Sequence, residues 1–173
     1  KCTAGVNKKL GVFSALIPTP EVVLLDEPTK GVDPVSRRDF WRILYSLLDL
    51  GVSIIVTTAY LDEAERCNQI GLMHNGRLMA CGTPDEVKSN LRGVLLEVRC
   101  AQPRQAARAL RRALPGDSIG LFGERIHLLT QDEARARRAC ASCAEGAINT
   151  IRPVEPSLED VFVSMLACQE EMP

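Results

Sequence analysis

A run of four apolar residues that ends in two adjacent carboxylates places the strongest constraint on how this 173-residue chain folds. Residues 22–25 are valine or leucine, and Asp26 and Glu27 follow them directly. A short apolar run bounded by prolines is typical of a parallel strand that is buried on both faces. Because parallel sheets bind ligands beyond the carboxyl ends of their strands, Asp26 and Glu27 are predicted to lie at a binding site.

Paired carboxylates at a strand end suit the hydrolysis of a nucleoside triphosphate. In phosphoryl transfer, one carboxylate holds the metal ion that bridges the phosphates, and a second polar group orients or deprotonates the attacking water. We therefore predict that Asp26 binds Mg²⁺ and that Glu27 acts on the water. The alternative is that both residues form a surface pair before the helix that is predicted to start near Pro34.

This stretch resembles the ATP-binding cassette (ABC) ATPases, and specifically the nucleotide-binding domains of ABC-2-type exporters. Asp26 and Glu27 match the Walker B aspartate and the catalytic glutamate of that family, and residues 30–34, Lys-Gly-Val-Asp-Pro, match its D-loop. Residues 53–65 match the strand and loop that carry the switch histidine of the family. In this sequence Ala59 stands at the switch position, so a methyl group replaces the imidazole.

The first residues are a partial match to the signature turn of the family, Ser-Gly-Gly-Gln. Thr3, Ala4 and Gly5 stand where that turn offers a hydroxyl and backbone N–H groups to the γ-phosphate of a nucleotide on the opposite subunit. The sequence holds no Gly-x-x-x-x-Gly-Lys-Ser/Thr, so the P-loop of the family is expected upstream of Lys1. We therefore interpret the chain as a piece of a longer protein.

The resemblance implies a function, cofactors and partners. ATP and Mg²⁺ are the expected cofactors, and the expected partners are a second nucleotide-binding domain, in a homodimer or heterodimer, and an ABC-2-type membrane permease. The chain would then belong to a cytoplasmic ATP-hydrolysing subunit at the inner face of the cell membrane, with Asp33 linking the two sites of the dimer. The alternative, favoured by Ala59 and the altered signature, is a degenerate pseudo-ATPase or a regulatory interaction module in an asymmetric dimer.

Composition agrees with a globular chain and argues against a general nucleic-acid binder. The formal net charge is -1, and the isoelectric point is near 6.2. No apolar run approaches the roughly 20 residues of a membrane span. The seven cysteines are scattered without framework spacing, which fits a reducing compartment.

The predicted elements divide the chain into two domains, and the fold class is α/β. Residues 1–90 are predicted to form the C-terminal half of an ABC-type P-loop NTPase domain, which ends in a hairpin at Asn75 and Gly76 and a short helix. Residues 93–168 are predicted to form a small ferredoxin-like α+β domain, in which Ser157 caps the last helix. The strands and helices of this second domain are predicted over residues 94–99, 103–113, 118–122, 125–129, 132–143 and 149–153.

The remaining charged residues concern the surface of the second domain and a short helix of the first. Seven arginines on two helices of the second domain can form a basic surface for a partner or for anionic lipid headgroups, or can be solvated helix faces. They are Arg104, Arg108, Arg111, Arg112, Arg135, Arg137 and Arg138. His127 is expected to be an ordinary strand residue, and Asp62, Glu63 and Glu65 are expected to complement the dipole of a short helix without a catalytic role.

Overall fold

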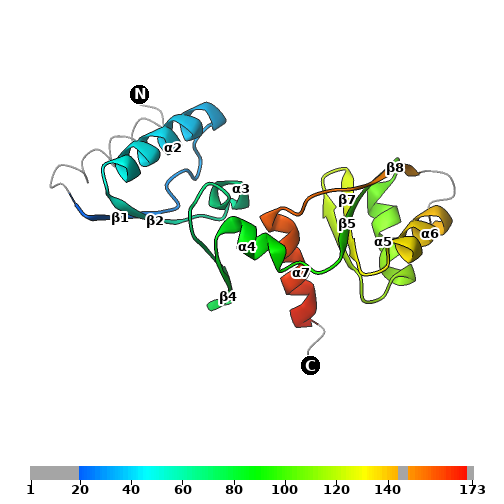
Figure 1. The fold of residues 1–173 in the computed structure, drawn as a ribbon. Coiled ribbons are helices and arrows are strands. Elements are labelled where there is room, and N and C mark those ends of the chain that lie inside the picture. The colour runs from blue at the N-terminus through cyan, green and yellow to red at the C-terminus, as the bar shows by residue number, and fades with distance from the viewer. Residues whose placement is uncertain (1–19, 144–147, 171–173) are drawn as a thin grey trace. The chain divides into compact units, whose positions relative to one another are not determined.

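The computed structural model describes residues 20–143 and 148–170, and the chain divides into two compact units, residues 1–63 and 64–173 (Figure 1). The signature residues Thr3, Ala4 and Gly5 lie outside the described residues. The hairpin and short helix that were expected to close the first domain group with the second unit. The predicted division between residues 90 and 93 therefore stays a prediction.

The first unit is built on a pair of parallel strands. Strand β1 (Val22–Asp26) pairs with β2 (Ser53–Thr57), and helix α2 (Pro34–Asp49) connects them, as the sequence predicts. Helix α2 buries four side chains, each of which contributes roughly 1.5–3 kcal/mol through its burial. These side chains are Phe40, Trp41, Leu44 and Leu47. After β2 comes the short helix α3 (Leu61–Ala64), and the first unit ends within it, at Glu63.

The prediction that β1 is buried on both faces is wrong for the described residues. Val22 and Leu24 of β1 are 52% and 73% exposed, and Ile55 of β2 is 57% exposed. Leu24 and Ile55 are register partners, so they point to the same side of the sheet. The other side, which includes the buried Val23, lies toward α2 (Figure 1). Within residues 20–63, one face of the pair is therefore covered and the other meets solvent.

The second unit starts with the predicted hairpin. Strands β3 (Ile70–His74) and β4 (Arg77–Gly82) pair in antiparallel fashion around a two-residue turn. Asn75 and Gly76 have φ angles of +48° and +74°, which are the left-handed values that such a turn needs. Helix α4 (Pro84–Ser89) follows, and a capping box formed by Thr83 and Glu86 begins it.

A four-stranded antiparallel sheet forms the rest of this unit. Its strands lie in the order β6-β7-β5-β8. The predicted sequence strand, helix, strand, strand, helix, strand is confirmed, and each boundary agrees within one residue. The elements are β5 (Val94–Cys100), α5 (Pro103–Ala113), β6 (Ser118–Phe122), β7 (Arg125–Thr130), α6 (Glu133–Cys143) and β8 (Ile148–Pro153).

The two faces of this sheet are covered by different helices. Helices α5 and α6 pack on one face and form the main core with Leu96, Val98, Ile126 and Leu128. Helix α7 (Leu158–Glu170) contacts the other face, and the predicted Ser157 cap is confirmed, because Ser157 Oγ accepts from the N–H of the third helical residue at 3.3 Å. Among the helices in the described ranges, none has the length and apolar character to cross a membrane.

Gly93 at the entry to β5 gives a test of this sheet, with Gly116 as the matched position. Both have positive φ, +115° and +91°, but a Cβ at Gly93 would also overlap the carbonyl oxygen of Thr130, whereas nothing lies within 4 Å at Gly116. We expect Gly116→Ala to cost about 1–2 kcal/mol of unfolding free energy and Gly93→Ala to cost more than about 3 kcal/mol. Urea unfolding followed by far-UV circular dichroism measures both, and equal costs would contradict this packing.

Candidate functional site

The two parallel strands bring the predicted catalytic carboxylates to one sheet edge. Asp26 and Thr57 are register partners at the carboxyl ends of β1 and β2, and the Thr57 hydroxyl donates a hydrogen bond to the Asp26 carboxylate. The backbone N–H of Glu27 donates to the Thr57 carbonyl at 3.0 Å and lies 3.2 Å from its hydroxyl. Asp26 is exposed and Glu27 is half-buried, so both side chains lie at a surface that a ligand can reach.

Glu27 adopts a backbone conformation that is rare for a residue with a side chain. Its φ angle is +44°, in the left-handed region. The chain turns sharply there, since the Lys30 N–H donates to the Glu27 carbonyl at 3.2 Å. Left-handed residues other than glycine concentrate at functional sites, where the surrounding structure holds them. This turn directs the chain away from the sheet immediately after Asp26.

The chain then reaches Asp33, which begins helix α2. The Asp33 carboxylate accepts hydrogen bonds from the N–H groups of Ser36 and Val35 at 2.9 and 3.1 Å. The hydrogen bond from the Ser36 N–H is the main reason that the pKa of Asp33 lies below its ordinary value. The structure thus gives Asp33 a capping role, and its predicted role across a dimer stays a prediction.

Ala59 lies two residues beyond the end of β2, on the loop that follows the strand next to Asp26. Its side chain is exposed, and a methyl group neither donates nor accepts a hydrogen bond. Of the predicted catalytic and metal-binding residues, Asp26 therefore ends β1, and Glu27 and Ala59 follow the carboxyl ends of β1 and β2. Asp33 lies instead at the start of α2.

A buried glutamate joins the loops around this edge. Glu63 is fully buried, and its Oε2 accepts hydrogen bonds from the hydroxyls of Thr29, at 2.8 Å, and Thr58, at 3.2 Å. Its Oε1 lies 3.2 Å from Nε of Arg37, whose guanidinium stacks on the Tyr60 ring at 4.3 Å. One carboxylate therefore ties the turn after β1, helix α2 and the loop after β2 together.

Sequence reasoning missed this role of Glu63. It grouped Glu63 with Asp62 and Glu65 as charges that complement a helix dipole, but Glu63 is buried and the other two are exposed. The available signal was a threonine shortly after each strand, Thr29 and Thr58, because such hydroxyls need an acceptor when they are buried. The local sequence pattern does not indicate which of the three carboxylates accepts these hydrogen bonds.

The residues at the sheet edge fit a Mg²⁺ ion that is also held by phosphates. Mg²⁺ in nucleotide sites is bound by one or two carboxylates together with phosphate oxygens and waters, not by an all-protein cage. Asp26 is an exposed carboxylate at the carboxyl end of β1, where such an ion would be bound. Within residues 20–143 and 148–170, no group of three or more His, Cys, Asp or Glu residues is arranged to hold a metal ion alone.

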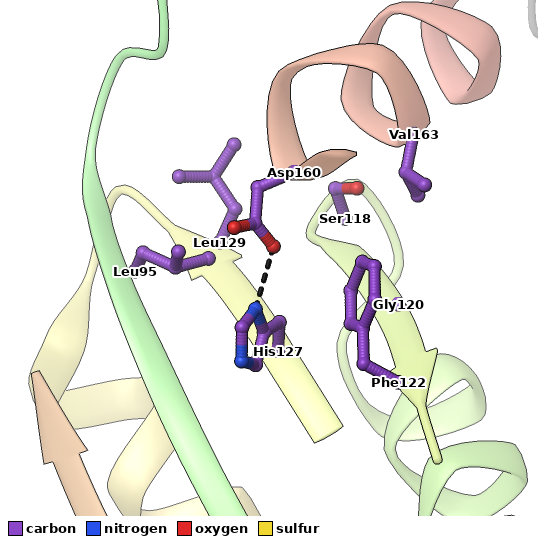
Figure 2. Close-up of a pocket in the computed structure, with 8 residues that line it drawn as sticks. All are labelled: Leu95, Ser118, Gly120, Phe122, His127, Leu129, Asp160 and Val163. Carbon is purple, nitrogen blue, oxygen red and sulfur yellow. Dashed lines mark hydrogen bonds and ion pairs between the residues drawn. The ribbon is translucent and has the colours of Figure 1, made fainter. Parts of the chain in front are cut away.

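A second polar cluster lies in the second unit, on the face of the sheet toward α7 (Figure 2). His127 of β7 points between the sheet and the helix, and its Nδ1 lies 2.6 Å from Oδ1 of Asp160. Phe122 of β6 packs on the imidazole, with ring centroids 4.7 Å apart. His127 is in a strand, as expected, and the structure adds that it fastens α7 to the sheet.

Glu97 of β5 is the other buried carboxylate on this face. It is only 3% exposed and forms ion pairs with Arg99 at 2.9 Å, Arg152 at 2.9 Å and Arg125 at 3.4 Å. Burial alone would raise the pKa of Glu97, but the hydrogen bonds and charges of Arg99 and Arg152 outweigh burial and hold the pKa below its ordinary value. These contacts satisfy a charge that would otherwise be costly to bury.

The carboxylates at the end of β1 and the comparisons with known proteins define the class of this chain. No protein-family model matches it. Curated proteins that match nearly all of its length, or about half of it, are ATP-binding proteins named for daunorubicin/doxorubicin resistance, for Nod factor export or for a probable multidrug ABC transporter. The homologues of this chain are thus ABC transporter ATP-binding proteins.

Three relatives illustrate the match. The probable multidrug ABC transporter ATP-binding protein YbhF of Escherichia coli (strain K12) is 46% identical over 85 residues, which are 49% of this chain and 15% of YbhF. The daunorubicin/doxorubicin resistance ATP-binding protein DrrA of Streptomyces peucetius is 32% identical over 94% of this chain and 52% of its own length. The Nod factor export ATP-binding protein I of Rhizobium etli is 33% identical over 98% of this chain and 52% of its own length. The chain thus spans about half the length of the last two relatives.

Replacing Glu63 tests the network that joins the loops of the candidate site. Glu63→Ala leaves Arg37 and two hydroxyls without their acceptor, so we expect a loss of about 3–5 kcal/mol in unfolding free energy. Asp62→Ala is the control, because Asp62 is 66% exposed and 3.9 Å from Arg37, and we expect it to cost less than about 1 kcal/mol. The fluorescence of Trp41, the single tryptophan, reports unfolding of the first unit. Similar losses in both variants would contradict the network.

Asp160 makes the docking of α7 sensitive to acid. Burial raises the pKa of Asp160, but hydrogen bonds from His127 and Ser157 outweigh burial and hold the pKa below its ordinary value. A lowered pKa in the folded state stabilises the fold above the unfolded-state pKa of about 3.9, and that stability is lost as the pH falls through the folded-state pKa.

We therefore expect Asp160→Asn to lower the melting temperature near neutral pH and to flatten its decline below about pH 4. Melting curves by circular dichroism from neutral to acid pH measure both effects. Glu159→Gln is the control, because the neighbouring Glu159 is exposed and should leave the curve unchanged. An acid decline as steep in Asp160→Asn as in the unaltered chain would contradict this assignment.

Proposed function

We propose that this chain supplies the Walker B half of an ATP-hydrolysing nucleotide-binding domain of an ABC-2-type exporter. The proposal rests on one observation above all, the placement of Asp26 and Glu27 at the carboxyl edge of the β1–β2 pair. The names of its relatives, one an ATP-binding protein of drug resistance and one of Nod factor export, support the proposal. In this proposal, residues 1–90 belong to the nucleotide-binding domain and residues 93–168 to an accessory domain.

The proposed roles follow the chemistry of each residue. Asp26 holds Mg²⁺ on the phosphates of ATP, and Glu27 accepts a proton from the attacking water. Asp33 links the two sites of a dimer of nucleotide-binding domains, and the turn at Thr3 to Gly5 contacts the nucleotide of the partner domain. A membrane permease of the ABC-2 type completes the exporter, and this places the chain at the inner face of the cell membrane.

The second domain is proposed to be a ferredoxin-like accessory domain. Support comes from its element order and from the sheet order β6-β7-β5-β8, in which the first and third strands are neighbours at the centre. This is the arrangement of a split βαβ unit. The hairpin β3–β4 and helix α4, which precede it, group with it in one compact unit.

A second candidate function is a degenerate site in an asymmetric dimer. The observation that favours it is Ala59, which puts a methyl group where the resemblance leads us to expect a histidine. In that case the chain binds nucleotide or its partner domain but does not hydrolyse ATP efficiently. The two candidates differ in whether the Glu27 carboxylate is used for turnover.

The test joins this chain to the P-loop half of an ABC nucleotide-binding domain and measures ATP binding and phosphate release with Mg²⁺. We expect Glu27→Gln to reduce hydrolysis by roughly 10²–10⁴-fold while ATP binding persists, since a general base contributes about that much. We expect Ala59→His to raise hydrolysis at least about tenfold, because the imidazole adds a donor beside the phosphates.

Binding of ATP, measured by calorimetry, shows that each variant is folded. A joined protein that binds ATP, hydrolyses it at a rate that Glu27→Gln does not change, and gains nothing from Ala59→His would contradict the enzymatic proposal. That result would instead favour the degenerate site. Hydrolysis that depends on Glu27 even with Ala59 present would contradict the degenerate alternative.

A further inference from the structure

Helices α5 and α6 carry far more positive than negative charge. Helix α5 holds four arginines and no acidic residue, and α6 holds three arginines and Glu133. Two of the seven arginines have partners, because Arg111 donates to the Ile119 carbonyl at 2.8 Å and Arg137 pairs with Glu133 at 2.8 Å. The other five are exposed and form no ion pair within the described residues: Arg104, Arg108, Arg112, Arg135 and Arg138.

These five arginines lie on one surface, which we call the arginine face. Both helices bury their small residues in the same core on one side of the sheet, Ala106 and Ala107 from α5 and Ala136 from α6. The helices contact each other, and Figure 1 shows them side by side over the four-stranded sheet. The outward sides of the two helices therefore form a continuous surface. The whole chain has a net charge of -1, so this positive charge is locally concentrated.

Helix stability does not explain the arginine face. Arg104, Arg108 and Arg112 follow one another at four-residue intervals, and like charges at this spacing destabilise a helix. Arg112 lies in the last turn, where a positive charge complements the helix dipole, but a glutamate at position 104 or 108 would stabilise α5 through its neighbours, yet the helix has none. An arrangement that opposes folding and leaves guanidinium groups in solvent indicates an external anionic ligand.

The surroundings of the arginine face indicate what kind of ligand it fits. Stable protein interfaces use buried aromatic or aliphatic anchors, but no large exposed hydrophobic residue lies in the described residues of α5 or α6. Guanidinium groups bind phosphates well, and a phospholipid surface offers many phosphates without requiring a shaped pocket. One relative of the chain is named as a transporter protein, and the overall charge of the chain argues against nucleic acid.

We propose that the arginine face binds the anionic headgroups of a phospholipid membrane. The interaction is electrostatic and peripheral, because the apolar side of each helix is already packed in the core and no helix among the described residues can span a bilayer. Membrane binding does not depend on ATP hydrolysis, so its test is independent of the proposed function.

The test is co-sedimentation of the full chain with vesicles of phosphatidylcholine, alone or with about one third phosphatidylglycerol. We expect binding to the anionic vesicles only, in about 0.1 M salt, and its loss in about 1 M salt, where charges are screened within about 3 Å. Each arginine near an anionic surface contributes roughly a fivefold gain in affinity, so R104Q/R108Q/R112Q should weaken binding roughly a hundredfold.

A matched variant removes the same charge elsewhere. R38Q/R77Q/R92Q replaces three exposed arginines outside α5 and α6 and should bind as the unaltered chain does. R135Q/R138Q tests the same face from α6 and should lose about 25-fold. Circular dichroism checks that each variant is folded. Absence of binding to anionic vesicles, equal losses in the α5 and control variants, or binding to a DNA duplex in place of the vesicles would each overturn the proposal.

Discussion

The parallel register between β1 and β2 is the constraint on which the candidate site depends. It places Asp26 opposite Thr57, so the threonine can hold the carboxylate through its hydroxyl and the backbone of Glu27 through its carbonyl. Because side chains alternate between faces along a strand, a slip of one residue would turn Asp26 to the other side of the sheet. The same register puts Leu24 and Ile55 together on the exposed face. The position of the Asp26 carboxylate and the exposure of this apolar pair thus have a single cause.

Three buried carboxylates fasten the connections between elements in both units. Glu63 joins three segments of the first unit, while Glu97 and Asp160 secure the strands and the last helix of the second. Each has two or more partners that compensate for the loss of water around its charge. Such contacts contribute to specificity as well as stability, since an alternative packing would leave a charge buried alone.

Sequence reasoning succeeded where the information is local. Asn75-Gly76 predicts a two-residue hairpin because its residues accept positive φ, and Pro103 predicts the start of α5 because its fixed φ suits a first helical turn. It failed where the answer depends on what packs from elsewhere in the chain. The apolar residues of β1 look buried in the sequence, yet Leu24 is 73% exposed, and three neighbouring acids look alike, yet only Glu63 is enclosed. The prediction of Asp26 and Glu27 as site residues also rests on a local signal, and the structure places Asp26 at the end of β1 and Glu27 directly after it.

Helix α7 has a consequence for the order in which the second unit forms during synthesis. Asp160 of α7 contacts His127 of the sheet, and Phe162 of α7 contacts His74 of the hairpin. The helix also contacts α4, so it packs against several parts of the unit at once. All of those parts leave the ribosome before it does. The core between the sheet and helices α5 and α6 can assemble early. The opposite face of the sheet stays exposed to water until α7 is made, and until then His127 lacks its contact with Asp160. Cotranslational folding of this unit is therefore expected to proceed one face at a time, with the nascent chain remaining open to chaperones until α7 emerges.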